Sequence, residues 1–212
     1  MRDIPVFATE FGAASLTLSQ IPTQHKAYVR IQATQDLQKL VEECVSFCRM
    51  CGAQQVYATG HTALNAYPYH TSILSMSCRK DCLADTSAWL EPVRQETLFT
   101  WKDIYNDKIQ NVPNAACMSI KQAQEMLAEQ SGYFVFKDEN CVGIGRASDA
   151  MIKWVAATQM GAGADIVLAL AKQIKDDVIS LEVAQTNIKA LLLYKRLGFD
   201  QDKEISRWYK IY

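Results

Sequence analysis

Apolar and polar residues alternate along two segments in the first part of the chain, Ala14–Ser19 and Ala27–Ile31. Between them lies a polar turn that contains Pro22-Thr-Gln. Alternation with a period of two on both sides of a short turn is typical of a β-hairpin whose strands bury one face. The pattern therefore predicts a pair of antiparallel strands in this region.

The spacing of the apolar residues changes after this hairpin. Along Leu37–Cys51 they recur every three or four positions, which predicts an amphipathic helix with Thr34 as its N-terminal cap and Gly52 at its end. Two further strands are predicted at Gln55–Ala58 and Ser72–Cys78. This order of elements indicates a sheet with a helix packed on one face.

Strands and helices also follow one another in the remainder of the chain. The predicted strands are Ala88–Glu91, Tyr133–Phe136, Val142–Ala147, Met151–Ala156, Val178–Val183 and Ile205–Ile211. The predicted helices are Leu98–Ile109, one that starts at the capping box Ser119–Gln122, Ala164–Lys175 and Asn187–Leu197. This order predicts an α/β layout. The polar segment Arg79–Ser87 is the candidate linker, so we expect one portion over residues 1–83 and a second over 84–212.

The composition is that of a globular protein. Of the 212 residues, 49% are apolar and 21% are charged, which argues against a disordered, collagenous or coiled-coil chain. The 22 basic and 23 acidic side chains give a net charge of −1, and residues 1–83 hold 7 basic and 6 acidic ones. Neither portion is a basic arm, so we expect no nucleic-acid partner.

Two absences in the sequence bear on the compartment. The first ten residues hold no apolar stretch of the signal-peptide type, and no run of 18 apolar residues occurs. We therefore expect a cytoplasmic protein without a membrane partner, whose seven cysteines are reduced. A zinc site formed by Cys48, Cys51, Cys78 and Cys82 is the alternative reading. Because the first pair lies on the apolar stripe of the predicted helix, we expect core thiols and no metal.

The turn Gly161-Ala-Gly163 lies between a predicted strand and a predicted helix. Free N–H groups at a helix start, next to a turn without side chains, allow a pyrophosphate to approach the backbone. A dinucleotide-binding fold is one interpretation, since Glu182 follows at about 20 residues, where a ribose-binding acid would stand. However, Ile166 occupies the position of the third glycine of that fingerprint. A tight turn without a ligand is a further alternative.

The segment that follows distinguishes these interpretations. Leu181-Glu-Val183 precedes the run Asn187-Ile-Lys-Ala-Leu-Leu-Leu-Tyr-Lys-Arg-Leu-Gly-Phe199. This run resembles the acyl-CoA-binding half of the GNAT superfamily of N-acetyltransferases, whose pattern after a strand is N-x-x-A-x-x-L-Y-x-x-x-G-F, and every fixed position matches. The similar order of strands and helices extends over about Ala88–Tyr212. The resemblance implies a mixed, mainly antiparallel central sheet flanked by helices, and acetyl-CoA (CoA) as the cofactor.

In this family two neighbouring strands part, and the pantetheine arm of the cofactor pairs with the exposed edge of one of them. The resemblance implies that the main chain of Trp154, Val155, Ala156 and Ala157 binds the pantetheine and the thioester carbonyl. Fixed backbone donors suit an oxygen on which negative charge develops.

The resemblance also assigns the pyrophosphate to the glycine turn. The backbone N–H groups implied are those of Gly161, Ala162, Gly163 and Ala164. Thr158 stands where the family pattern has Arg or Gln, and Asp165 adds a negative charge nearby. We therefore expect the backbone alone to hold the phosphates.

Tyr194 is the residue to which the resemblance assigns chemistry. Family members use the tyrosine at this position to protonate the departing thiolate, and a phenol with a pKa near 10 retains its proton at neutral pH. Asn187 is expected to touch the pantetheine or to cap its helix. Glu182 is our candidate general base, and Asp149 is the alternative. Core positions are expected for Trp89, Trp101, Tyr105 and Trp208.

The first third of the chain resembles a partial unit of the same kind, without the glycine turn and the tyrosine motif, so we expect it to bind no cofactor. The expected activity is transfer of the acetyl group from acetyl-CoA to a primary amine by direct attack in a ternary complex. The acceptor is expected to be a small-molecule amine or a peptide amine, and a homodimer is a candidate assembly. A non-catalytic acyl-CoA-binding or regulatory protein on the same fold is the alternative.

Overall fold

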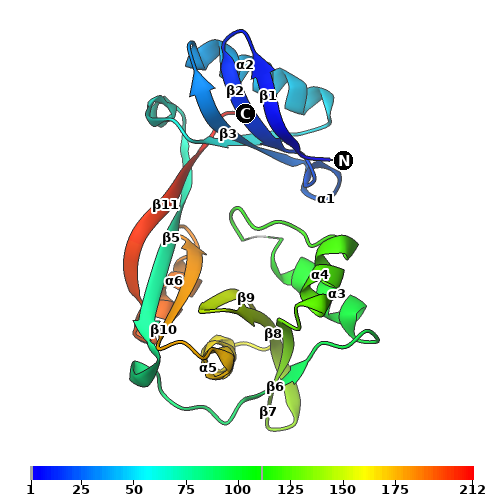
Figure 1. The fold of residues 1–212 in the computed structure, drawn as a ribbon, viewed down its shortest axis with the longest axis vertical. Coiled ribbons are helices and arrows are strands. Elements are labelled where there is room, and N and C mark those ends of the chain that lie inside the picture. Colours follow the sequence, from blue (N-terminus) through cyan, green and yellow to red (C-terminus); the bar gives the residue numbers. More distant parts are fainter. Residues whose placement is uncertain (1, 111) are drawn as a thin grey trace. The chain divides into compact units, whose positions relative to one another are not determined.

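The computed structural model describes residues 2–110 and 112–212 and divides the chain into two compact units (Figure 1). Unit 1 contains the chain up to Ile73 together with Glu204–Tyr212, and unit 2 contains Leu74–Lys203. Strands β5 (Tyr69–Arg79) and β11 (Asp200–Lys210) each contribute residues to both units. The boundaries therefore fall within two strands, whereas the sequence suggested one boundary after residue 83.

Unit 1 is a sheet in the order β1-β2-β3-β4-β11. Its further elements are β1 (Ile4–Thr9), β2 (Gly12–Thr17), α1 (Ile21–Gln24), β3 (Lys26–Thr34), α2 (Leu37–Met50), β4 (Gln55–Thr59) and a 3₁₀ turn, η1 (Thr62–Ala66). The predicted hairpin is present as β2 and β3, with the short helix α1 in its turn. All pairs are antiparallel except β3 with β4, which α2 connects as a crossover.

Helix α2 begins two residues later than the sequence suggested. Its cap is Asp36, whose carboxylate accepts from the Lys39 N–H at 3.2 Å, while Thr34 still belongs to β3 and its hydroxyl donates to the Phe11 carbonyl. The buried face of α2 includes Cys44 and Cys48, both fully buried, and burial raises the pKa of each thiol to about 12. These cysteines are therefore neutral apolar groups of the core of unit 1, as expected.

Unit 2 is a sheet in the order β5-β10-β9-β8-β7-β6. Its elements are a 3₁₀ turn, η2 (Lys80–Cys82), β6 (Trp89–Pro92), α3 (Leu98–Lys108), α4 (Ile120–Ala128), β7 (Gly132–Lys137), β8 (Asn140–Ser148), β9 (Met151–Ala157), α5 (Gly163–Gln173), β10 (Val178–Ala184) and α6 (Ile188–Arg196). The strands β6 to β9 are antiparallel neighbours, and β9 with β10 is parallel. The predicted capping box Ser119–Gln122 is confirmed at the start of α4.

Two apolar cores lie in unit 2. One joins α5 and α6 to the sheet, and the other joins α3 and α4 to it. On β8, Gly143 and Gly145 face α5 so closely that a Cβ on either would collide with Ile166 or Leu170. The two glycines therefore let α5 lie close against the sheet and fix where its first turn stands.

The structure confirms the expected fold class, a mixed and mainly antiparallel sheet with flanking helices. Within the part of the chain that the structure describes, no helix is both long and apolar enough to span a membrane.

Candidate active site

Within the described residues, only the first two residues of β9 pair with β10. Their paired positions are Ser180 with Met151 and Leu181 with Ile152, and among the described residues the register between them ends there. Strand β9 continues to Ala157 with β8 as its neighbour. Beyond Ile152, the edge of β9 that points away from β8 therefore carries backbone N–H and C=O groups that pair with no strand of the described residues.

A β-bulge marks the point at which the two strands part. Strand β9 has one extra residue, Lys153, between the positions that face two successive residues of β8. The bulge shifts the alternation of side chains, so that Val155 and Ala157 pack in the core with α5, whereas Trp154 and Ala156 pack in the core with α3 and α4. The sequence analysis missed this bulge.

The glycine turn leads from β9 into α5. Gly161 has a φ of +86° and open space where a Cβ would stand, and Ala162 is the residue before the first turn of α5. The first N–H groups of a helix have no acceptor within it, and no side chain of the described residues caps this end. At Gly163, a Cβ would stand 2.8 Å from Leu193 Cδ2 of α6. The turn is therefore open to an anion and lies directly beside α6.

Asp165, the third residue of α5, is held by two partners. Its carboxylate accepts from the Thr86 hydroxyl at 2.8 Å and from Lys137 Nζ at 2.9 Å. Burial favours the neutral acid, but these two hydrogen bonds and the Lys137 charge outweigh it and lower the pKa of Asp165. The negative charge expected to oppose a phosphate is thus balanced by a cation from β7.

Helix α6 shows what several motif residues do. Asn187 caps the helix, with its side-chain oxygen accepting from the Ala190 N–H at 3.4 Å, so the capping alternative is the one observed. Gly198, at φ +96°, ends the helix, and Phe199 is fully buried. These residues form the two ends of the helix. The Tyr194 hydroxyl has no such role in forming the helix.

Tyr194 lies in the core that α5 and α6 share, and 9% of it is exposed. This core also holds Val155 and Ala157 of β9, Ala162 of the turn and Val183 of β10. Burial raises the pKa of Tyr194 to about 12, and no hydrogen bond to its hydroxyl occurs within residues 2–110 and 112–212. The fold thus brings the tyrosine together with the diverging strands and the glycine turn.

The two candidate bases lie at different places. Glu182 is exposed between buried Leu181 and Val183, and it is the first residue of β10 beyond the last pair with β9. Asp149 is exposed in the turn before β9, at φ +53°. Glu182 therefore stands where the strands part, and Asp149 at the opposite end of β9 from the glycine turn.

An aromatic and cationic cluster covers the other face of β9. The ring of Trp154 lies 4.8 Å from Tyr105 of α3, and the Arg146 guanidinium lies 4.7 Å from the Trp154 ring centre. Arg146 also pairs with Glu129 at 2.5 Å and donates to the Ser131 hydroxyl at 2.8 Å. Trp101 and Tyr105 are buried, as expected, whereas Trp89 is exposed and Trp208 is half-buried, so that part of the expectation was wrong. The cluster fixes the orientation of Trp154.

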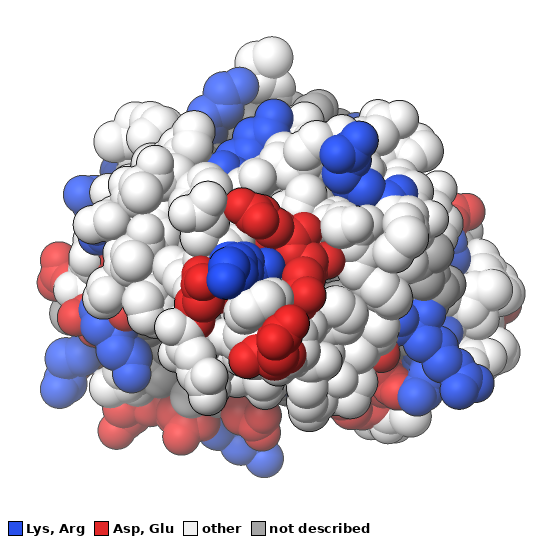
Figure 2. Space-filling view, turned by 90° about the horizontal axis from the view of Figure 1, so that it is seen from above, with Lys and Arg blue, Asp and Glu red and all other residues white. Residues whose placement is uncertain are grey.

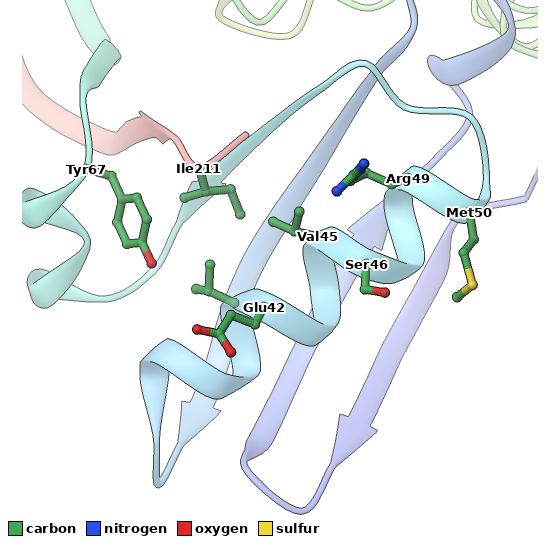
Figure 3. A pocket seen from close by; sticks show the side chains of 8 residues that line it. Glu42, Val45, Ser46, Arg49, Met50, Tyr67 and Ile211 are labelled. Atoms are coloured by element: carbon green, nitrogen blue, oxygen red, sulfur yellow. The ribbon is translucent and has the colours of Figure 1, made fainter.

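A separate groove of about 620 Å³ lies in unit 1 (Figure 3). It is lined by Glu42, Val45, Arg49 and Met50 along α2 and by neighbouring residues that include Tyr67. None of the predicted site residues lines it, so it plays no part in the candidate active site.

On the face drawn in Figure 2, acidic side chains gather around a basic one, and other basic side chains lie around them.

Comparison with known proteins identifies the fold. No family model matches the chain, and no curated protein matches it in sequence. A GCN5-related N-acetyltransferase from Sphaerobacter thermophilus has a similar structure, with a TM-score of 0.60 and 14% identity over 94% of this chain and 76% of that chain.

Two further solved structures give the same result. A GCN5-related N-acetyltransferase from Kribbella flavida has a TM-score of 0.60 and 9% identity, and the match covers 96% of this chain but only 58% of that one. A tandem GNAT protein from the clavulanic acid biosynthesis pathway has a TM-score of 0.51 and 11% identity over 95% of this chain and 79% of that chain. The chain therefore has the GNAT fold, as its tyrosine motif predicted, and identities this low show the fold alone.

Proposed function

We propose that unit 2 binds acetyl-CoA or a close acyl-CoA and transfers the acyl group to a primary amine. The observation that carries this proposal is the parting of β9 and β10 after Ile152 and Leu181, which leaves an unpaired backbone edge beside the glycine turn and Tyr194. An extended pantetheine arm carries amide groups that can pair with such an edge as a further strand would. The GNAT fold of the chain supports the same assignment.

The residues present fit coenzyme A. The backbone of Trp154–Ala157 would hold the pantetheine, and the N–H groups from Gly161 to Ala164 would hold the pyrophosphate, because the space beside Gly161 is open and the start of α5 has no cap from the described side chains. Asn187 is engaged in capping α6 and would contact the ligand only through its remaining polar atoms.

The chemistry of the cofactor is the supply of an acyl group as a thioester. Tyr194 holds a proton at its hydroxyl oxygen throughout the neutral range, because its pKa is raised to about 12, and can donate that proton to a departing sulfur. Glu182, exposed where the strands part, would take the proton that the acceptor ammonium must lose before its nitrogen can attack. The N–H groups of β9 would stabilise the oxygen on which charge develops.

The acceptor would approach β9 from the side of α3. The surface on that side is formed by Trp154, Tyr105 and Arg146. The ion pair of Arg146 with Glu129 holds the guanidinium in place over the Trp154 ring. A small-molecule amine or a peptide amine are the two acceptor classes we propose.

Calorimetry with acetyl-CoA and with CoA tests the binding step. We expect binding of both, and no heat at millimolar ligand would contradict the proposal. Release of free CoA across a panel of small amines and peptides, measured by mass spectrometry, then tests transfer. Binding without turnover of any amine would favour a non-catalytic acyl-CoA-binding or regulatory protein, a candidate that the absence of the family's Arg or Gln at Thr158 also favours.

A further inference from the structure

An ion pair stands at the start of α5, outside the glycine turn itself. Lys137, the last residue of β7, pairs through Nζ with the Asp165 carboxylate at 2.9 Å, and Thr86 donates to the other oxygen of that carboxylate at 2.8 Å. The Asp165 side chain is 22% exposed and that of Lys137 is 37% exposed. Neither residue belongs to the motif that the sequence shares with the GNAT superfamily.

Asp165 is a difficulty for a phosphate site. A carboxylate in the first turn of a helix interacts favourably with the positive end of the helix dipole and competes there with any anionic ligand. Left alone, Asp165 would repel a pyrophosphate at the same helix end, and Thr158 supplies no positive charge to offset it. The Thr158 hydroxyl instead donates to the Cys141 carbonyl at 3.0 Å.

The fold holds Lys137 and Asp165 together from both sides. Lys137 pairs with Asn140 across the tight β7–β8 hairpin, whose turn residues Asp138 and Glu139 have φ of +47° and +64°. Gly143, three residues further along β8, allows Ile166 of α5 to approach closely. The β7–β8 hairpin and α5 therefore hold the Lys137 ammonium group and the Asp165 carboxylate next to each other.

We propose that Lys137 is a positioning residue for coenzyme A, which keeps the Asp165 carboxylate neutralised and engaged away from the N–H groups at the start of α5. The pyrophosphate can then bind to the backbone without the Arg or Gln that the family pattern places in the loop. This inference rests on the function proposed above, and it explains how an acidic residue in the first turn of α5 is compatible with a pyrophosphate site that lacks the Arg or Gln of the family pattern.

A double-mutant cycle on CoA binding tests the inference. Calorimetry would compare the parent with Lys137→Gln, Asp165→Asn and the double variant, with the melting temperature of each as a folding control. We expect Lys137→Gln to raise the dissociation constant about tenfold, the effect of one unit charge acting over several ångströms. Asp165→Asn should leave the constant unchanged or lower it, and the double variant should return close to the parent.

The matched control is Lys39→Gln. Lys39 pairs with Asp36 at 3.5 Å at the start of α2 in unit 1, so this variant makes the same charge change at an ion pair beside another helix start. We expect no change in CoA affinity. Dephospho-CoA, which keeps the pyrophosphate but lacks the 3′-phosphate, should show the same tenfold loss with Lys137→Gln.

Each contrary outcome has a distinct meaning. A double variant as weak as Lys137→Gln would show that Lys137 binds phosphate directly, and would overturn its role through Asp165. Parent-like binding by Lys137→Gln would overturn the inference altogether. Absence of CoA binding by the parent would overturn the proposed function, and the inference with it.

Discussion

A pair of parallel strands joined by a helix occurs in each unit, and the two pairs are built differently. In unit 1, β3 and β4 pair at five successive positions, from Lys26 with Gln55 to Arg30 with Thr59. In unit 2, β9 and β10 pair at two positions only. The strands of the first pair stay paired over five positions, whereas those of the second pair part after two. We therefore call unit 1 the closed unit and unit 2 the open unit.

The starts of the two connecting helices differ in the same direction. The start of α2 is capped by the carboxylate of Asp36, which accepts from the Lys39 N–H and places a negative charge of the chain itself at this helix end. The start of α5 follows Ala162 and receives no cap from the described side chains, and its own acid, Asp165, is engaged with Lys137 and Thr86. One supersecondary element is thus complete in itself, whereas the other leaves backbone groups available to a ligand.

The largest expected effect concerns the tyrosine of the open unit. Tyr194→Phe keeps the ring and removes the proton donor, so we expect kcat for acyl transfer to fall about 100-fold to 10,000-fold with little change in CoA affinity. Tyr57→Phe is the matched control in unit 1, because burial also raises the pKa of Tyr57 and its hydroxyl donates to Gln55 Oε1 at 2.8 Å. Steady-state kinetics at neutral pH would decide, and equal kcat values for both variants would end the general-acid assignment.

The glycine turn provides the next test. Gly163→Val would place atoms against Leu193 and narrow the approach to the helix start, so we expect the CoA dissociation constant to rise by at least about tenfold, or 1.4 kcal/mol. Thr158→Ala removes only a hydrogen bond to Cys141 and should change it little. Thermal unfolding of both proteins serves as the folding control. A folded Gly163→Val protein that binds CoA like the parent would mean that the phosphates bind elsewhere.

The core of the closed unit should make the protein sensitive to alkali. Unfolded thiols ionise from about pH 9, whereas Cys44 and Cys48 retain their protons until about pH 12 because they are buried. Between these values the unfolded state binds fewer protons than the folded state, so the free energy of unfolding falls as the pH rises. Urea unfolding between pH 8 and 11 should show a shallower decline for Cys44→Ala/Cys48→Ala than for the parent. Parallel declines would show that other groups dominate.

The smallest effect is expected at the cap of α2. Asp36→Ala should lower the free energy of unfolding by about 1 kcal/mol, because an N–H of the first turn loses its acceptor. CoA affinity should stay that of the parent, since the cap belongs to the closed unit. Chemical denaturation and calorimetry measure the two quantities. Weaker CoA binding in this variant would remove the functional distinction between the two units.

Local patterns in the sequence predicted the parts of the fold that depend on neighbouring residues. The capping box at Ser119 and the strand-turn-helix around Gly161 each depend on a few consecutive residues, and the structure confirms both. The tyrosine motif predicted α6 because its Asn, Gly and Phe each form part of one helix and its ends.

Features that depend on distant pairing were not predictable in this way. Strand β1 was missed because Pro5 and an irregularity after Ile4 interrupt its alternation. The bulge at Lys153 depends on the register with β8. The Lys137–Asp165 pair joins residues from two elements, so their spacing along the chain gives no signal.

Because the boundaries between the units fall inside β5 and β11, unit 1 is encoded by two separate stretches of the gene, and unit 2 lies between them as the single stretch Leu74–Lys203. A fragment that begins at residue 84 would lose Leu74 and Met76, two core residues of the open unit, and would keep Tyr209, a core residue of the closed one. Recombination between related genes would therefore exchange such an open unit intact only with crossovers inside both strands.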